Sequence, residues 1–139
     1  MKQKHLGRAL LAALLALAAG VAYGQTDATA AKIPFAFRAA GSDLPAGEYR
    51  VGPESTNPQS IQLKNMDTGK IIFIHAKAPA TEYKNPRPRL IFRCGGEEGC
   101  ALATMLSGTG SGLEFPTPKL TANQRERRET IYLNHFKDK

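Results

Sequence analysis

The chain has 139 residues, and its 19 Lys and Arg residues against 12 Asp and Glu residues give a formal net charge of +7. This length fits one domain. The sequence has no Trp, and acidic and basic residues alternate along most of it, whereas nucleic-acid-binding domains concentrate basic residues and interleave them with aromatic ones. The composition therefore argues against binding to nucleic acid.

Residues 1–24 have the layout of a secretory signal peptide. Three basic residues precede an apolar run from residue 9 to about residue 22, and small residues follow up to Gly24. The run is shorter than the roughly 20 residues that a membrane-spanning helix needs, so cleavage after Gly24 is favoured over its alternative, a single membrane anchor. Cleavage lowers the formal net charge from +7 to +4. We expect residues 25–139 to form one exported domain without a membrane span, in the periplasm or outside the cell.

The pattern from Ala31 onward predicts an all-β domain. Apolar residues recur with a period of two, and Gly or Pro interrupts them about every 8–12 residues. Such spacing is typical of an antiparallel sandwich or a partly open barrel, here of roughly six to eight short strands. In KIPFAFRA we expect one strand, with Ile33, Phe35 and Phe37 on the same face.

The segment LPAGEYRV predicts a tight turn followed by a strand. Pro45 presets the backbone of the turn, Gly47 lets the chain leave it, and Tyr49 and Val51 then share one face. Glu48 points the other way and has no partner for acid–base catalysis. We therefore interpret the segment as structural.

A hairpin is predicted in SIQLKNMDTGKIIFIHAK, with its turn at Asp67 and Gly69. Residues 71–74 are apolar on both faces, which predicts a central strand. His75 ends this strand. Since no Ser, Cys or second His is expected close to it, we interpret His75 as structural and not catalytic.

The following segment, APATEYKNPRPR, has three prolines and no periodicity, so we expect a loop. The only local cluster of basic residues after the signal peptide begins in this loop, and no acidic residue interrupts it. One interpretation is a solvated loop, and the other is a binding surface for an anionic ligand. The candidate ligand-binding residues are Lys84, Arg87, Arg89 and Arg93.

Cys94 and Cys100 would both lie in an oxidising compartment after export. Their short separation predicts a disulfide and disfavours the alternatives, two free thiols or a metal site. A zinc site would need two further ligands, and neither His75 nor His135 is close in the sequence. We therefore expect no metal, and no sequence motif indicates a cofactor.

The segments RLIFRC and CALATML end and begin with these cysteines, and we expect them to pair as an antiparallel hairpin. With the cysteines opposite each other, Phe92 is expected opposite Leu102. The same register places Leu90 opposite Thr104. The disulfide and the apolar face are thus satisfied by one pairing.

The end of the chain allows two interpretations. SGTGSG lacks the Lys-Ser or Lys-Thr ending of a phosphate-binding loop and is interpreted as a flexible connection. Thr121 as N-cap and Gln124 three residues later form a capping-box pattern, which predicts a short C-terminal helix. The alternative is a last strand over residues 129–136, where residues alternate as in a strand.

Four motifs, IPFAF, LPAGEYRV, RLIFRC and RERRE, occur in this order. They resemble a family of small exported bacterial proteins of unassigned function, which carry I-P-F-x-F, an L-P-A-G-x-Y turn, a later L-x-F-R strand and E-R-E near the end. The likeness covers most of residues 32–129. It implies a signal peptide and a β-rich domain but no catalytic residue, and the loop CGGEEGC departs from the family pattern. LPAGEYRV also resembles a turn-and-strand segment of prealbumin-like adhesin repeats.

The function we expect from these features is that of a non-enzymatic exported domain that binds a cell-surface or extracellular component. An anionic envelope polymer or a surface protein would suit the basic loop. The principal alternative is a small barrel that carries an apolar small molecule. A third possibility is an enzyme whose groups meet only in space, such as Asp43 with Glu48. The sequence does not specify an oligomeric state.

Overall fold

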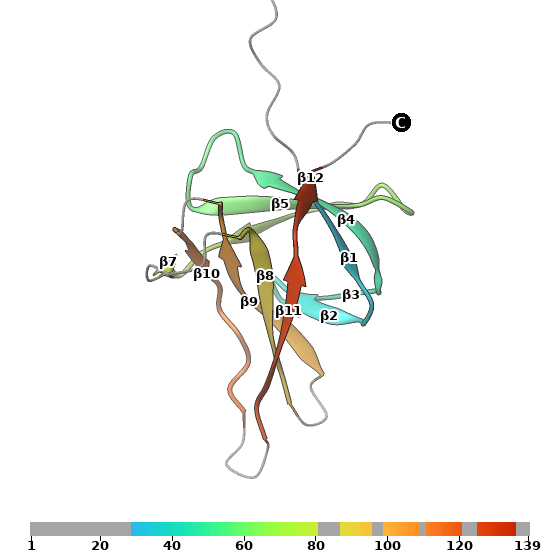
Figure 1. The fold of residues 1–139 in the computed structure, drawn as a ribbon, viewed down its shortest axis with the longest axis vertical. Coiled ribbons are helices and arrows are strands. Elements are labelled where there is room, and N and C mark those ends of the chain that lie inside the picture. Colours follow the sequence, from blue (N-terminus) through green and yellow to red (C-terminus); the bar gives the residue numbers. More distant parts are fainter. Residues whose placement is uncertain (1–28, 81–86, 96–98, 109–110, 121–124, 136–139) are drawn as a thin grey trace, which may run out of the picture.

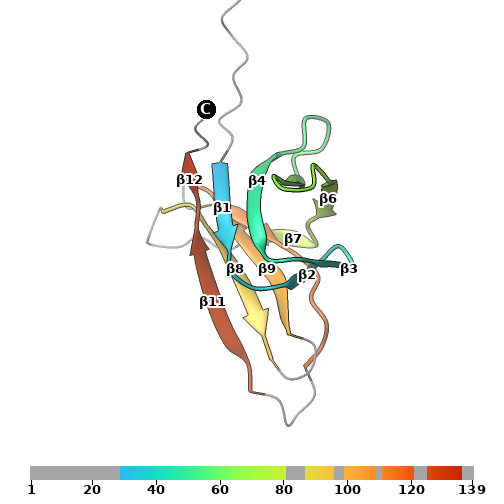
Figure 2. The ribbon, with the colours of Figure 1, turned by 90° about the vertical axis from the view of Figure 1, so that its right-hand side faces the viewer.

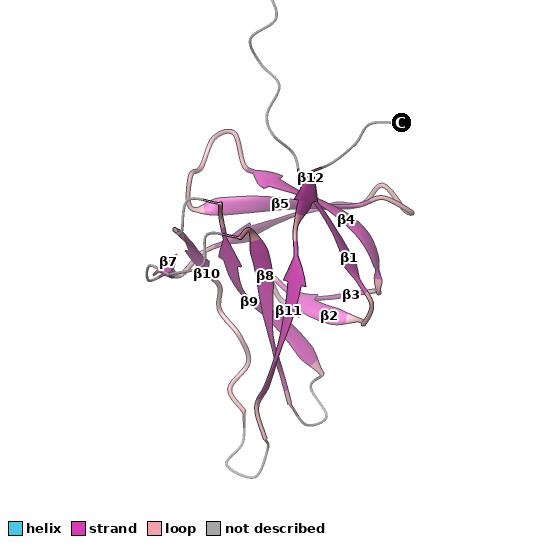
Figure 3. Cartoon of the chain, in the orientation of Figure 1, coloured by secondary structure: helices cyan, strands magenta, loops and turns pink. Residues whose placement is uncertain are grey.

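The computed structural model describes residues 29–80, 87–95, 99–108, 111–120 and 125–135. Within these residues the chain consists of β-strands and connections and contains no helix (Figure 3). The strands are β1 (Thr29–Ile33), β2 (Phe37–Ala39), β3 (Ser42–Leu44), β4 (Gly47–Pro53), β5 (Ser60–Asn65), β6 (Ile71–His75), β7 (Ala78–Ala80), β8 (Arg89–Cys94), β9 (Cys100–Leu106), β10 (Gly112–Glu114), β11 (Arg127–Tyr132) and β12 (Asn134–His135).

The strands form two sheets (Figure 1). The first sheet is antiparallel and has the order β12-β1-β4-β5-β6. The second has the order β11-β8-β9-β10-β7, and β2 extends it by pairing in parallel with β9 and antiparallel with β3. The two sheets do not close into a barrel. The predicted all-β fold is therefore confirmed, whereas the described residues of the C-terminal segment contain no helix.

One hydrophobic core joins the two sheets. Phe37 from β2 contacts Tyr49 of the first sheet and Phe92 of the second, with ring centroids 5.3 Å apart in each pair and an edge-to-face geometry. All three rings are almost fully buried. Because their residues alternate with more exposed neighbours, each strand presents one apolar face to this core.

The turn in LPAGEYRV has the structural role that the sequence predicts. The Tyr49 hydroxyl donates a hydrogen bond to the carbonyl oxygen of Pro45, 2.6 Å away, and accepts one from Asn65 Nδ2 at 3.2 Å. Burial is the main cause that raises the pKa of Tyr49 above its ordinary value, so the hydroxyl remains a neutral donor. The tyrosine therefore fixes the turn to the start of β4 and to the end of β5.

Between the described strands the chain crosses from one sheet to the other four times. It leaves the first sheet after β1 and after β6, and it returns to it between β3 and β4 and again between β11 and β12. In the last crossing, β11 pairs with β8 and β12 pairs with β1. Figure 2 shows β11 and β12 in succession along the same edge of the molecule. Leu133 lies between them, is buried, and donates its backbone N–H to the Pro88 carbonyl at 3.0 Å.

The first predicted strand is in fact two strands in different sheets. β1 ends at Ile33 and β2 begins at Phe37, so the expectation of one continuous strand is wrong. Pro34 has no N–H for a strand ladder, and the chain changes sheets directly after Ile33. Phe35 still packs on the core, with its ring centroid 5.1 Å from that of Phe92.

The strand at residues 71–75 lies at the edge of its sheet, which corrects the prediction of a central strand. Among the described strands, β6 pairs with β5 alone. Ile71 and Phe73 are 45% and 48% exposed, whereas Ile74 is 2% exposed. A strand that is apolar on both faces is fully buried only where a second layer packs against its outer face. The described residues provide no such layer over Ile71 and Phe73.

The segment predicted to form the C-terminal helix contains β11, so the helix prediction is wrong for residues 127–132. β11 pairs along its whole length with β8. The exposed edge of β8 gives these residues backbone partners that an isolated short helix would have to supply by itself. The strand kept as the alternative, residues 129–136, overlaps β11 and β12. Thr121 and Gln124 lie outside the described residues.

Candidate functional site

The Cys94–Cys100 disulfide closes the β8–β9 hairpin, as the sequence predicts. The Gly95 N–H donates to the Gly99 carbonyl at 3.0 Å, so the neighbouring cysteines form a pair without backbone hydrogen bonds. Such pairs approach more closely than bonded ones, and the two Cα atoms are 4.0 Å apart. A cross-link over so short a loop stabilises the fold by about 2 kcal/mol through chain entropy. Its role here is structural.

The predicted register of β8 with β9 is confirmed next to the disulfide and wrong further along the hairpin. Phe92 faces Leu102 as expected, but Leu90 faces Met105 and not Thr104. The register shifts between Ile91 and Phe92, because β9 contains one additional residue there. Such a β-bulge bends the strand and changes the direction in which its side chains point. It brings Ala103 and Thr104 into the same outer surface as Ile91.

The predicted basic loop is not a single cluster in the structure. Lys84 lies outside the described residues. Arg89 and Arg93 are at opposite ends of β8, four positions apart, which corresponds to about 13 Å along a strand. Both alternate with the buried residues of β8, so they share its outer face. The proline-rich loop therefore delivers Arg87 and Arg89 to one end of the face, and Arg93 belongs to the other end.

The guanidinium of Arg93 is held by two side chains. Its Nε and Nη2 donate to the two carboxylate oxygens of Glu126 at 2.8 and 3.2 Å, and its Nη1 donates to Thr117 Oγ1 at 3.1 Å. A two-point contact of this kind fixes both the position and the plane of the guanidinium. Arg93 is thus oriented on the outer face of the second sheet.

A second arginine approaches the same carboxylate. Arg128 lies directly opposite Arg93 in the β11–β8 pair, and its Nε is 3.6 Å from Glu126 Oε1. The hydrogen bond from Arg93 is the main cause that lowers the pKa of Glu126 below its ordinary value, and Arg128 adds to the effect. Glu126 is consequently a carboxylate bound between two cations at neutral pH.

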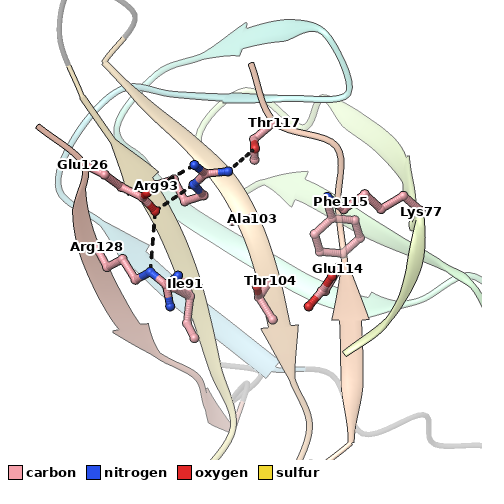
Figure 4. A pocket seen from close by; sticks show the side chains of 10 residues that line it. All are labelled: Lys77, Ile91, Arg93, Ala103, Thr104, Glu114, Phe115, Thr117, Glu126 and Arg128. Atoms are coloured by element: carbon pink, nitrogen blue, oxygen red, sulfur yellow. Dashed lines mark hydrogen bonds and ion pairs between the residues drawn. The ribbon is translucent and has the colours of Figure 1, made fainter. Parts of the chain in front are cut away.

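These residues border a hollow of about 320 Å³ on the outer face of the second sheet, here called the charged basin (Figure 4). Lys77 and Glu114 line its opposite side. The floor is formed by short or apolar side chains of β8 and β9. The described lining carries three cations and two carboxylates. It consists of Lys77, Ile91, Arg93, Ala103, Thr104, Glu114, Phe115, Thr117, Glu126 and Arg128.

Two further arginines lie at the other end of the β8–β11 pair. The guanidinium carbon of Arg87 is 3.8 Å from the centroid of the Tyr132 ring, a cation–π contact. Arg89 lies opposite Tyr132 and donates from Nη1 to the Arg87 carbonyl at 3.1 Å. Arg87, Arg89, Arg93 and Arg128 are together called the basic stripe.

Sequence reasoning missed Arg128, Glu126 and Lys77 as members of this surface. The helix prediction assigned the first two to a charged helix, and Lys77 is distant in the chain. A signal was present in RERRE, since Glu126 and Arg128 are two residues apart and therefore lie on one side of an extended strand. Their partner on β8 was visible only after pairing.

Ser60 and His75 form a contact that the sequence interpretation did not expect. Ser60 begins β5, His75 ends β6, and the Ser60 Oγ is hydrogen-bonded to His75 Nδ1. Ser60 is only 1% exposed, so its hydroxyl is covered in this conformation. The contact ties the two ends of the β5–β6 pair together.

The carboxylates named as a possible catalytic pair have other neighbours. Asp43 is 3.3 Å from Arg38 Nε in the β2–β3 hairpin. Glu48 lies opposite Lys32 in the β1–β4 pair. Among the described residues, no group of three or more His, Cys, Asp and Glu side chains is arranged to hold a metal ion.

Comparison with models of protein families, with curated proteins and with solved structures finds no match. The resemblance to small exported bacterial proteins therefore stays a prediction. In the part of the chain that the structure describes, no helix has the length and apolar character needed to cross a membrane.

Proposed function

We propose that the protein is a non-enzymatic exported module that binds an acidic polymer of the cell envelope through the basic stripe and the adjoining charged basin. The observation that carries this proposal is the convergence of Arg93, Arg128 and Lys77 on one basin, from three segments of the chain. Export is supported by the N-terminal sequence pattern and by the Cys94–Cys100 disulfide, a bond typical of oxidising compartments.

Glu126 supports a carboxylate as the ligand group. Its two oxygens already accept hydrogen bonds from Arg93, which demonstrates that a carboxylate fits the guanidinium in this position. Arg128 approaches the same carboxylate less closely, at 3.6 Å, and its side chain is 70% exposed. A carboxylate from a ligand can therefore pair with Arg128 without displacing buried groups.

The length of the basic stripe favours a polymer over a small anion. Arg89 and Arg93 are about 13 Å apart along β8, so a chain with repeated negative charges can contact both ends at once. A single exposed ion pair contributes only about 0–1 kcal/mol. Several such pairs on one polymer act together, because each contact holds the next charge close to its partner.

Binding to immobilised polygalacturonate, a polymer of carboxylates, tests the proposal, with uncharged dextran as the control polymer. Arg128→Glu should weaken binding by about tenfold, since it replaces attraction by repulsion at an exposed site. Lys64→Glu, the same charge change on a strand of the other sheet, should have an effect below about twofold. Rising salt concentration should weaken the binding of the parent protein.

Two results would contradict the proposal. One is binding of Arg128→Glu that equals the binding of the parent protein, with an unchanged thermal midpoint. The other is equal retention of the parent protein on polygalacturonate and on dextran.

A further inference from the structure

A second hollow, here called the apolar cleft, lies between the two sheets and has a volume of about 370 Å³. Both sheets contribute to its described lining, together with the crossing between β11 and β12. Its large apolar side chains are Val51, Ile61, Met105, Leu106, Leu113 and Leu133. None of its described lining residues belongs to the charged basin. The two features can therefore be altered independently.

The apolar cleft offers little to a charged or strongly polar ligand. No described residue in its lining carries an ionisable side chain, and its three hydroxyl groups already have partners. Thr29 Oγ1 donates to the Val51 carbonyl at 3.1 Å, and Ser107 Oγ donates to the Ser111 carbonyl at 2.9 Å. The third, Ser60 Oγ, is bonded to His75. A polar ligand would lose its hydrogen bonds to water without replacement.

The size and depth of the cleft suit a small molecule. Its volume falls in the range of about 300–1,000 Å³ that is common for ligand pockets. Val51 and Leu106 are 2% and 1% exposed and form a buried wall, whereas Met105 and Leu113 are only partly buried. A ligand that covers these two side chains removes apolar surface of both molecules from water, which favours binding.

We propose that the apolar cleft binds an uncharged, mainly hydrocarbon small molecule. This function is additional to polymer binding and does not depend on the basic stripe. The ligand class follows from the absence of ionisable groups in the described lining, from its engaged hydroxyls and from the volume of the cleft.

Fluorescence titration with N-phenyl-1-naphthylamine, an uncharged apolar probe, tests this inference on the disulfide-bonded protein. The parent protein should give a saturable increase in fluorescence. Leu113→Trp should lower the affinity at least tenfold because the larger side chain fills the cleft. Ile72→Trp is the matched control, since Ile72 is also partly buried against the core but does not line the cleft. It should change the affinity less than twofold.

A measurement on the parent protein removes any dependence on how the variants fold. At saturation with the probe, the methyl NMR resonances of Val51, Ile61 and Leu113 should shift, while those of Leu44 and Ile72 should not. Arg128→Glu should bind the probe as the parent does, which separates this inference from polymer binding. A linear, unsaturable titration, or shifts confined to residues outside the cleft, would overturn it.

Discussion

Glu126 is the residue on which the proposed polymer site depends most directly. It occupies Arg93 with both oxygens and lies close to Arg128, so it orients the cations and also competes with a ligand for them. These two effects have opposite signs for binding. Its neighbour in sequence, Glu129, pairs with Arg127 at 2.8 Å and does not line the charged basin.

Glu126→Gln is expected to strengthen binding to polygalacturonate by several fold. The substitution removes the competing negative charge while an amide keeps the size and one acceptor oxygen. Isothermal titration calorimetry at low salt measures the change. Glu129→Gln removes the same charge outside the basin and should change the affinity less. A loss of binding in Glu126→Gln would mean that the carboxylate is needed only to hold the arginines, and the competition would be disproved.

The ion pairs of Glu126 also predict how the stability of the fold changes with pH. Because the folded state lowers the pKa of Glu126 below its ordinary 4.5, the ion pairs stabilise the fold fully above that ordinary value. This stabilisation disappears as the pH falls through the lowered pKa. The difference in unfolding free energy between the parent and Glu126→Gln should therefore be present at pH 7 and shrink in acid. Urea unfolding at a series of pH values measures it, and a difference that grows in acid would contradict the assignment.

At the level of elements, the position of β6 at the edge of its sheet determines how much each of its apolar residues contributes to stability. Ile71 and Phe73 point away from the core on an edge strand, and Ile74 points into it. The hydrogen bonds of Ala76 to Gln59 and of Asn65 to Lys70 fix which residues of β6 face β5 with their backbone. Residues with and without backbone hydrogen bonds to the partner strand alternate along β6, so the N–H and C=O groups of Ile71 and Phe73 point away from β5.

Ile74→Ala and Phe73→Ala should differ strongly in their effect on stability. Ile74 is 2% exposed, so its truncation leaves a cavity and should cost about 2–5 kcal/mol. Phe73 is 48% exposed and should cost under about 1 kcal/mol when truncated. Chemical denaturation of both variants makes the comparison. Equal losses would indicate that another layer covers β6, as a central strand would require.

At the level of the whole molecule, the two sheets are held together by a shared core and by the connections through which the chain passes from one sheet to the other. The last crossing is the most local of these connections, since Leu133 alone separates β11 from β12. Its side chain is buried and its N–H is bonded to Pro88. The C-terminal strands thus connect the edges of both sheets through β8 and β1.

Leu133→Ala is expected to destabilise the whole fold by about 2–5 kcal/mol, because the lost side chain lies where the sheets meet. Asn134→Ala, at the adjacent exposed position, should change stability by no more than about 0.5 kcal/mol. Thermal unfolding followed by circular dichroism compares them. If both substitutions had equally small effects, the crossing would contribute nothing to the association of the sheets.

The sequence by itself determined the all-β class, the turn at Pro45 and Gly47, and the pairing of Cys94 with Cys100. These are local properties. Alternation with a period of two is a backbone geometry, turn residues act through their own dihedral angles, and two cysteines in one short hairpin have little choice of partner. Such features can be predicted from neighbours along the chain.

Only the tertiary structure decided which strands lie at an edge, where the chain changes sheets, and which charges meet. The capping pattern at Thr121 predicted a helix, but residues 127–132 pair with the free edge of β8, because long-range backbone pairing outweighs a weak local preference. The same pairing sets Arg128 opposite Arg93 and forms the charged basin. The apolar cleft likewise requires both sheets. Each of these features joins residues that are distant in sequence, and neither composition nor periodicity encodes their contact.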